Sequence, residues 1–324
     1  MNLGWAGTHT REIALAIANL LLLALLAATT QGFFTAANLA DLFLANMPVM
    51  LIALGMMLII LTGQIDISVG SVFAVCSVAA GLAAREGAPS LVFLLVAIVV
   101  GTACGALNGV LSAYLRIPSI VVTLATAVVL RDGLRWGTEG AWVGNLPQGF
   151  QRFGVPQGPY TLLVLAATIA LVALVAWALR FLRVGRAVFA TGSNEAAAKQ
   201  LGINTNLVVF TVFGITGALT GLAATLNAVR FNQIPSNSGI GLEMKVIAAV
   251  AVGGAAITGG SATVLGTVLG VILLGLIGPA LTFLGVSAYW EKALQGGMIL
   301  LAVSANVLAS YRLRRRSSGV TLAA

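Results

Sequence analysis

Side chains that could carry out acid–base or metal chemistry are few and scattered in this sequence. The chain has nine acidic residues and one histidine, His9, in 324 positions. A histidine-based triad or a multi-histidine metal site needs more than one imidazole. The phosphate-binding pattern Gly-x-x-x-x-Gly-Lys-Ser/Thr is also missing from the sequence. We therefore predict no catalytic residue, no metal site and no cofactor bound by this chain.

Two acidic residues at apolar segments, Asp66 and Glu243, are the first candidates for a functional role. An ionisable group is costly in hydrocarbon, so it marks either a transport path or a helix cap near an interface. Counting spans places Asp66 on the cytoplasmic side and Glu243 on the other, so they need not share a site. Side chains suited to a neutral solute are Ser68, Asn108, Trp136, Asn145, Gln233 and Trp290.

Residues 183–205 have the pattern of a short helix in water. Ser193 or Asn194 can cap this helix, and Gly202 can end it. Glu195 would lie in the first turn, where the helix dipole favours a negative charge, and would pair with Lys199 four residues later. Such a helix is either a connector or a docking element for a partner subunit.

The composition places these residues in a membrane protein. Hydrophobic residues make up 59% of the chain and charged residues only 8%, where a soluble domain carries about 25% charged residues. In hydrocarbon each backbone polar group must be bonded within the chain, which permits helices or closed barrels. The long apolar runs lack the alternation of a barrel strand. We expect an all-α integral membrane protein.

A spanning helix needs about 20 apolar residues, and this length predicts about ten transmembrane helices, with eight to ten as the range. Two of the runs are short and bounded by glycine, so they could be re-entrant segments or breaks in longer helices. The expected spans are Ile13–Thr30, Leu44–Leu61, Val69–Ala84, Leu91–Tyr114, Ile120–Leu130, Leu162–Phe181, Leu207–Val229, Ile247–Ile257, Val264–Leu284 and Leu294–Ser310.

The net charge of +8 is explained by orientation in the bilayer and not by nucleic acid, because the basic residues lie between and after the spans. With both termini cytoplasmic, ten of the 17 basic residues are inside. They include a cluster at the end of the sixth span and a cytoplasmic basic tail at residues 311–324. The ten are Arg11, Arg116, Arg180, Arg183, Arg186, Lys199, Arg312, Arg314, Arg315 and Arg316.

Glycines recur four residues apart within the spans, at 101–105–109, 217–221 and 266–270. Small residues at this spacing let helix backbones approach closely in lipid, for tight packing or for a sliding interface. The third and eighth spans each begin with an acidic residue followed by small and β-branched residues. With five spans per half, they would run in opposite directions, as in a five-plus-five inverted repeat.

Three ordered segments, 64–71, 185–203 and 239–260, resemble the permease subunits of bacterial ABC importers for monosaccharides. That family includes ribose, arabinose, xylose, galactose, rhamnose and autoinducer-2 systems, and the resemblance runs from the second span to Tyr311. It implies a type II ABC importer-like fold, with 1–324 as a single transmembrane permease domain and 183–205 as its cytoplasmic coupling loop. Gly63-Gln64 departs from the family's frequent Gly-Gly at that place.

The resemblance also implies roles for single residues. The family's coupling motif matches Gly185, Arg186, Gly192, Asn194, Glu195 and Ala197. Its motif after the second span matches Asp66, Ser68, Gly70 and Ser71, and its later glycine-bounded element matches Gly241, Glu243, Gly253 and Gly254.

The implied partners are cytoplasmic ABC ATPase subunits that hold ATP and Mg, a second permease copy or close homologue, a soluble sugar-binding protein and membrane lipid. The implied location is the bacterial inner membrane. The expected substrate is a small neutral sugar, for example a pentose or deoxyhexose such as ribose or rhamnose, with autoinducer-2 as the close alternative. A second hypothesis, from a different class of transport protein, is an autonomous channel or ion-coupled carrier. A membrane-embedded enzyme is disfavoured because the sequence has few residues that could act as acid–base partners.

Overall fold

The computed structural model describes residues 3–287, 289–298, 300–301 and 304, with side chains from residue 10 onward. Within that part of the chain the secondary structure is helical, apart from an isolated antiparallel bridge between Val143 and Ile234. The all-helical expectation is therefore confirmed. The helices are α1 Leu3–Thr29, α2 Ala36–Leu61, α3 Val69–Arg85, α4 Ser90–Ala113, α5 Ser119–Gly137, η1 Gln151–Gly154, α6 Gln157–Phe181, α7 Arg183–Ser193, α8 Glu195–Gln200, α9 Thr205–Ala228, α10 Leu242–Val252 and α11 Val264–Phe283.

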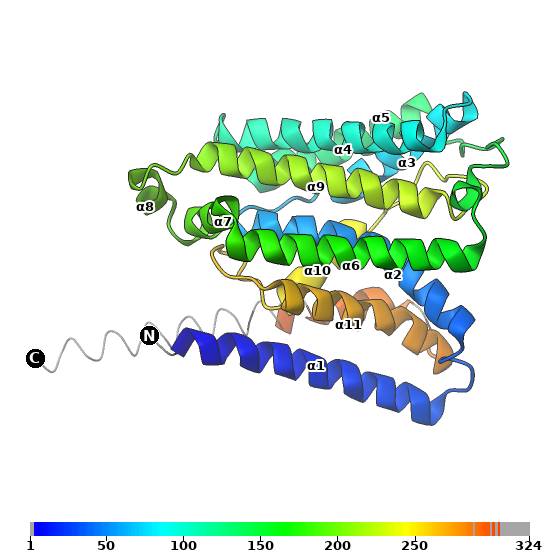
Figure 1. Cartoon of the computed structure of the whole chain (residues 1–324), viewed down its shortest axis with the longest axis horizontal. Helices are drawn as coiled ribbons and strands as arrows, with labels where there is room; N and C mark the ends of the chain where they lie inside the picture. Colours follow the sequence, from blue (N-terminus) through cyan, green and yellow to red (C-terminus); the bar gives the residue numbers. More distant parts are fainter. Residues whose placement is uncertain (1–2, 288, 299, 302–303, 305–324) are drawn as a thin grey trace, which may run out of the picture.

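Six of the described helices are long and apolar enough to cross a membrane unaided: α1 from Thr10, α2, α4, α6, α9 and α11. They run side by side in one bundle (Figure 1). In the apolar window of α2, 83% of residues are buried, against 11% for α1 and for α6. Helix α2 is therefore the core of the bundle, whereas α1 and α6 turn most of their apolar surface to the surrounding lipid.

Helices α7 and α8 lie together at one end of the bundle, and α1 begins at that same end (Figure 1). We call it the α8 end. The N-terminal side of the chain and the segment 183–205 thus share a side of the membrane, as the distribution of basic residues predicted. Of the tenth expected span, residues 294–298, 300–301 and 304 belong to the described part of the chain, and the basic tail 311–324 lies outside it.

Two helices in the bundle are short. Helix α3 has 17 residues and α10 has 11. At a rise of about 1.5 Å per residue, α10 is only about 16 Å long, roughly half the thickness of the hydrocarbon core. The irregular segments that precede these helices, 62–68 and 229–241, must therefore complete the passage. Segment 62–68 is buried or partly buried apart from Gly63, whereas in 229–241 only Val229, Ile234 and Ser236 are buried.

These two irregular segments enter the bundle from opposite ends. The first leaves Leu61, whose carbonyl accepts a hydrogen bond of 2.9 Å from the Gly260 amide near the α8 end. The second is held at the far end, where Ile234 pairs with Val143 of the loop between α5 and α6. Helices α3 and α10 therefore begin inside the bundle with opposite directions, which fits the inverted relation expected for the third and eighth spans.

Several helix boundaries differ from the sequence prediction: for example, α1 begins at Leu3 rather than Ile13 and α6 at Gln157 rather than Leu162. Helix α2 starts at Ala36 rather than Leu44, because the Thr35 hydroxyl caps it by accepting from the Asn38 amide. Helix α5 continues beyond Leu130 to Gly137, and the prediction missed this because Arg131 and Asp132 interrupt the apolar run. Helix α10 covers Leu242–Val252 rather than Ile247–Ile257.

The predicted glycine contacts hold α4 against α9. A Cβ atom at Gly101 would overlap the carbonyl of Gly217, and one at Gly217 would overlap the carbonyl of Gly101. Gly105 lies in the same way on the carbonyl of Phe213. The two backbones are therefore in direct contact, which gives dispersion attraction in a solvent where burial of apolar side chains gains nothing.

We predict that Gly217→Val destabilises the protein by about 1–3 kcal/mol or more, because the new side chain must push α9 away from α4. Gly214→Val is the matched control, since it adds the same side chain to the same helix where a Cβ meets no atom within 4 Å. Thermal unfolding of the purified protein in detergent should show a lower midpoint for Gly217→Val alone. Equal midpoints would contradict the close backbone contact.

Candidate functional site

The segment 62–68 is irregular backbone inside the bundle, and its amides are bonded to hydroxyl groups of α5. The Ile65 amide donates to Ser119 Oγ at 3.2 Å, and the Ile67 amide donates to Thr123 Oγ1 at 3.1 Å. Buried backbone amides without partners are costly, so these two hydroxyls are what permits a non-helical segment here. Helix α5 thereby fixes where α3 begins.

Asp66 is the centre of a buried hydrogen-bond chain at the start of α3. Its Oδ1 accepts from the Ser68 amide at 2.8 Å and from the Ser68 hydroxyl at 2.6 Å. Asn108 of α4 donates to Ser68 Oγ at 2.9 Å, and its own oxygen accepts from Thr126 of α5 at 2.7 Å. Asp66 is only 3% exposed. The structure thus brings together three of the predicted path residues, Asp66, Ser68 and Asn108.

Glu243 occupies the equivalent position at the start of α10. Gly241 precedes it with φ +82°, a left-handed conformation that glycine adopts readily. Glu243 Oε1 accepts from the Gly241 amide at 3.3 Å, whereas Oε2 is buried with no hydrogen-bond partner among the described residues. The carboxylate lies against Gly70 of α3, where a Cβ atom would collide with Oε2.

The starts of α3 and α10 therefore meet, and the expectation that Asp66 and Glu243 lie on opposite sides of the membrane is wrong. That count treated each apolar run as a full crossing. Because α10 is only 11 residues long and its preceding segment re-enters from the far end, Glu243 comes within contact distance of Gly70, one turn from Asp66. Gly239 also touches the Gly70 carbonyl.

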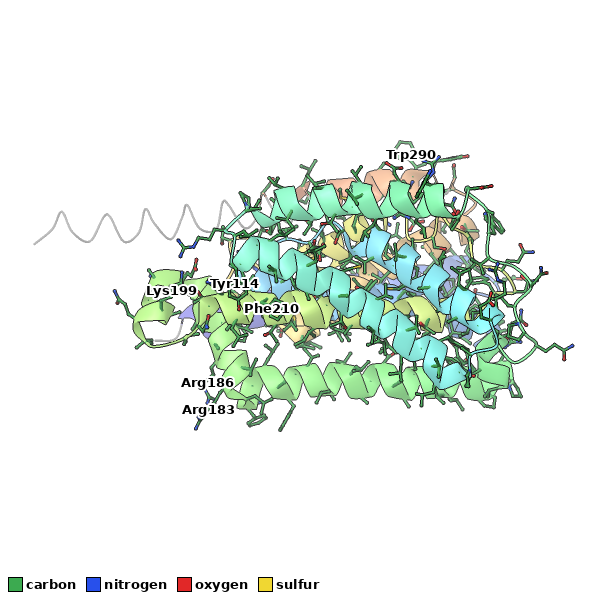
Figure 2. The ribbon with its side chains drawn as sticks, turned by 90° about the horizontal axis from the view of Figure 1, so that it is seen from above. Tyr114, Arg183, Arg186, Lys199, Phe210 and Trp290 are labelled. Atoms are coloured by element: carbon green, nitrogen blue, oxygen red, sulfur yellow. The ribbon has the colours of Figure 1, made fainter. Side chains whose placement is uncertain are left out.

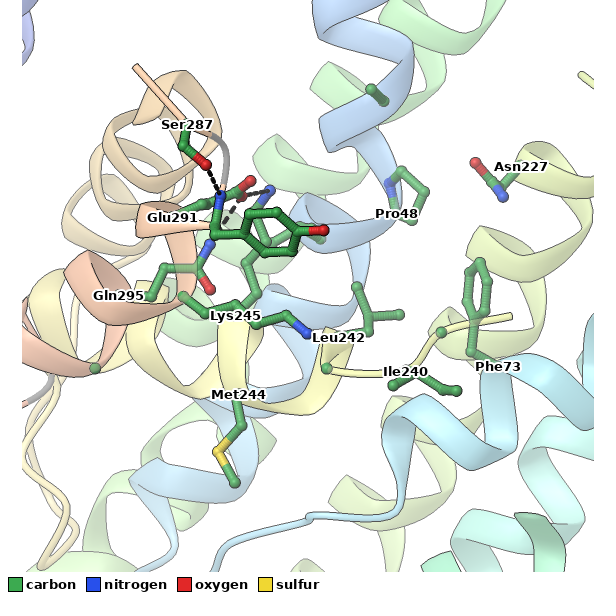
Figure 3. Close-up of a pocket in the computed structure, with 17 residues that line it drawn as sticks. Pro48, Phe73, Asn227, Ile240, Leu242, Met244, Lys245, Ser287, Glu291 and Gln295 are labelled. Carbon is green, nitrogen blue, oxygen red and sulfur yellow. Dashed lines mark hydrogen bonds and ion pairs between the residues drawn. The ribbon is translucent and has the colours of Figure 1, made fainter. Parts of the chain in front are cut away.

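A cavity of about 910 Å³ lies beside this meeting point (Figure 3). The cavity is lined by Phe73 of α3, Pro48 of α2, Asn227 at the end of α9 and Leu242 of α10. Near the end of the described chain, its lining includes Ser287, Tyr289, Glu291, Lys292, Gln295 and Gly296. Its volume lies within the range of about 300–1,000 Å³ for small-molecule sites. The mixture of apolar walls and a few polar groups is suited to a small solute.

Two of the three charged side chains that line this cavity, Lys245 and Glu291, form an ion pair. Lys245 Nζ lies 3.6 Å from Glu291 Oε1, with side-chain exposures of 22% and 29%. Gln295 donates to the same Glu291 oxygen at 2.9 Å, and Gly278 of α11 leaves the space that the carboxylate fills. This pair carries no net charge, and Lys292, which also lines the cavity, adds one positive charge beside the hydrogen-bonding groups.

A second, more polar cavity of about 340 Å³ lies at the α8 end. Thr62 and Gln64 of the first irregular segment line it, together with Arg116, Glu195 and Lys199. Along the chain, residues 65–70 lie between Gln64 of this cavity and Phe73 of the larger one. The buried Asp66 network and the Gly70 contact therefore lie, along the chain, between the residues that line the two spaces.

The helix predicted between residues 193 and 202 is confirmed as α8, and Asn194 rather than Ser193 is its cap. The Asn194 side chain accepts from the Ala197 amide at 3.0 Å. Glu195 pairs with Lys199 at 2.6 Å and accepts from the Thr205 hydroxyl at 3.2 Å. The pKa of Glu195 lies below its usual value, chiefly because of the hydrogen bond from Lys199. Upstream of Asn194 the chain forms a separate helix, α7, which the sequence did not distinguish from a loop.

Two glycines of the coupling motif are sites of close backbone approach. A Cβ at Gly192 would collide with the carbonyl of Leu61, the last residue of α2, and would lie 2.7 Å from the Gly260 amide. We call Leu61, Gly192 and Gly260 the junction. Gly185 lies in the same manner on Leu179 of α6, whereas Arg186 is exposed and donates to the Phe181 carbonyl at 3.4 Å.

The remaining predicted path residues are dispersed. Trp136, at the end of α5, is 86% exposed, and Trp290 is 60% exposed. Gln233 and Asn145 are exposed in the far-end loops. None of the four lines the larger cavity.

Sequence reasoning missed the polar and charged residues of that cavity, which are Asn227, Lys245, Ser287, Tyr289, Glu291, Lys292 and Gln295. Two of them, Lys245 and Glu291, could have been identified from the sequence, because they are residues of opposite charge that lie beside apolar spans.

With this geometry in place, the chain can be compared with known proteins. The family model "Branched-chain amino acid transport system / permease component" matches residues 38–303, and the chain belongs to this family of membrane transport permeases. It is a multi-pass membrane transport component rather than an enzyme. No solved structure matches it significantly.

Among the similar curated proteins are permeases of one named system. The "Autoinducer 2 import system permease protein LsrC" of Salmonella typhi is 35% identical over 295 residues, which are 91% of this chain and 85% of that protein. The protein of the same name from Escherichia coli O157:H7 is 36% identical over 299 residues, with 91% and 86% covered. The resemblance to the permeases of ABC importers is therefore confirmed.

We predict that Asp66→Ala lowers the stability of the protein by about 1–3 kcal/mol, because the Ser68 amide and hydroxyl would be left buried without an acceptor. Asp66→Asn is the matched control, since its amide oxygen can accept both hydrogen bonds in the same place. Thermal unfolding and the amount of folded protein in the membrane measure the difference. Equal loss in both variants would show that the negative charge, not the acceptor, is what this site requires.

Proposed function

We propose that this chain is the permease subunit of an ATP-driven importer in the inner membrane of a bacterium, and that it translocates a small neutral sugar or sugar-like solute by alternating access. The observation that carries the proposal is the junction. It joins the helices α7 and α8, which lie at one end of the bundle, to segment 62–68, which leads into α3, and to residues 253–263, which follow α10.

The junction gives a route for mechanical coupling. A displacement of α7 moves Gly192, which rests on the carbonyl of Leu61 and beside the Gly260 amide. Leu61 continues directly into the segment that holds Asp66, and Gly260 follows α10. One movement at the α8 end can therefore shift α3 and α10 together and open the contact between Gly70 and Glu243.

The surface of α8 is the proposed docking site for cytoplasmic ABC ATPase subunits, which hold ATP and Mg themselves. Asn194, Glu195 and Ala197 form the capped first turn, and Glu195 and Lys199 are partly exposed. Gly185 and Gly192 position α7, and Arg186 lies on its outer surface. A second permease copy or close homologue and a soluble binding protein at the far end complete the proposed importer.

The solute class follows from the larger cavity. Lys245 and Glu291 neutralise each other, and Asn227, Ser287 and Gln295 add uncharged donors and acceptors. Hydroxyl groups of a pentose, a deoxyhexose or a similar polyol can bond to such a lining, whereas a cation would meet the positive charge of Lys292 and a carboxylate, Glu291, that Lys245 already pairs. The name of the similar permeases makes autoinducer 2, the close alternative among sugar-like solutes, the first compound to assay.

The orientation can be tested with single cysteines at the two ends of the bundle. We expect Ser193→Cys, at the α8 end, to be protected from a membrane-impermeant thiol reagent in intact cells, and Gln148→Cys, in the far-end loop, to react. The unsubstituted protein gives the background, since Cys76 is buried and Cys104 is partly buried. External labelling of Ser193→Cys would overturn the proposed cytoplasmic position of α7 and α8.

The coupling role predicts that Glu195→Ala reduces ATP-driven uptake at least severalfold while its membrane abundance stays near that of the unsubstituted protein. The exposed pair with Lys199 stabilises the chain by only about 0.3–0.5 kcal/mol, so folding should survive its loss. Gln200→Ala, on the same exposed helix, is the matched control. Gly192→Val should have a larger effect, because it displaces the junction.

Uptake of labelled autoinducer 2, ribose and rhamnose by the complete importer tests the proposal as a whole. Accumulation should require an intact ATPase partner. Unchanged uptake after loss of ATP hydrolysis would instead identify an autonomous channel or ion-coupled carrier. Accumulation of an amino acid, and of no sugar-like compound, would contradict the proposed solute class.

A further inference from the structure

A chamber of about 410 Å³ opens between α6, α7 and α9, apart from the proposed solute path. Its walls are aliphatic: Leu174 and Leu179 from α6, Val184 and Val188 from α7, and Leu207 and Ile215 from α9. Leu58 of the central helix α2 forms part of its lining. A small hydroxylated solute would find almost no hydrogen-bonding group there, so this chamber is suited to a hydrocarbon chain.

The mouth of the chamber is basic. A second cavity of about 500 Å³ shares the lining residues Val184, Ala187, Leu207 and Val208 with the first, so the two spaces adjoin. The residues that it adds include Arg183, Arg186 and Asn204. Figure 2 shows both arginines at the same end of the bundle as Lys199, beside the end of α6. An apolar space thus adjoins a site with two guanidinium groups.

The charge of these arginines is not compensated by the chain around them. No acidic residue occurs in the sequence between Glu139 and Glu195. Glu195, the nearest in sequence on the α8 end, is bonded to Lys199 and Thr205. Among the described residues neither arginine forms an ion pair, and Arg186 makes only a long bond of 3.4 Å to the Phe181 carbonyl. An anion at the mouth would therefore meet two available guanidinium groups.

We propose that this chamber binds an anionic phospholipid, with an acyl chain between α6 and α9 and the phosphate at Arg183 and Arg186. The site lies where the apolar helix α6 ends at Phe181 and the basic, amphipathic helix α7 begins. Headgroups and acyl chains adjoin at this level of a bilayer, and basic pockets between spanning helices are suited to anionic headgroups. The lipid would pack against the side of α7 that faces the chamber and so help to set the position of Gly192 at the junction.

The test is lipid retention by the full-length protein purified from vesicles of phosphatidylglycerol and phosphatidylcholine in equal parts, measured by native mass spectrometry. We expect bound phosphatidylglycerol in preference to phosphatidylcholine. The double variant Arg183→Gln, Arg186→Gln should bind phosphatidylglycerol roughly 30-fold more weakly, since each basic group near the surface attracts such lipids. The double variant Arg85→Gln, Arg135→Gln is the control. It removes two exposed arginines from the last turns of α3 and α5, outside the chamber and its mouth, and should bind phosphatidylglycerol normally.

A second variant tests the chamber separately from its mouth. Val208→Phe places a larger side chain where the two spaces join and should reduce retention severalfold although both arginines remain. Equal retention in the arginine variant and the unsubstituted protein, or no preference between the two lipids, would refute the proposal. So would full competition by free glycerophosphate, which has no acyl chain. Cross-linking of Leu207→Cys between two copies would assign the chamber to a permease interface instead.

Discussion

The requirement that backbone polar groups be bonded away from water governs this structure. Helix α3 begins inside the bundle, so the irregular segment 62–68 before it places amides where lipid and water offer no partner. Ser119 and Thr123 of α5 bond the amides of Ile65 and Ile67, and Asp66 bonds that of Ser68. These few polar contacts allow a break in regular structure at mid-bundle, which is where a solute path between two inverted halves can pass.

The second constraint is the close approach of backbones through glycine. Gly101 and Gly217 bring α4 and α9 together as a rigid pair, and neither has to move in the proposed mechanism. Gly192 also permits close backbone contact, but with two segments that belong to different halves of the bundle. It therefore links the halves. The charged pair of α8 contributes little to stability, so its role is explained better by a partner that binds there than by the fold itself.

The sequence predicted the elements that depend on local signals. The cap at Ser193 or Asn194 and the ion pair of Glu195 are set by residues close in sequence. The four-residue spacing of the glycines predicted close helix packing, but not that α4 would pair with α9. The convergence of Asp66 and Glu243 was not predictable in this way, since it depends on α10 crossing only part of the membrane. Likewise, Lys245 and Glu291 are 46 positions apart by their numbers, and only the packing of α10 beside residues 290–298 makes them one pair in one cavity.

The central claim is that the buried contact between the starts of α3 and α10 opens during transport. Ser71 lies one residue beyond Gly70, is 5% exposed and donates to the Ala127 carbonyl. The most direct measurement is the rate at which a water-soluble thiol reagent modifies Ser71→Cys in the assembled importer. The account predicts slow modification at rest and a marked increase when ATP and loaded binding protein are supplied together. Protection that persists while uptake proceeds at its full rate would place the solute path elsewhere and contradict the account.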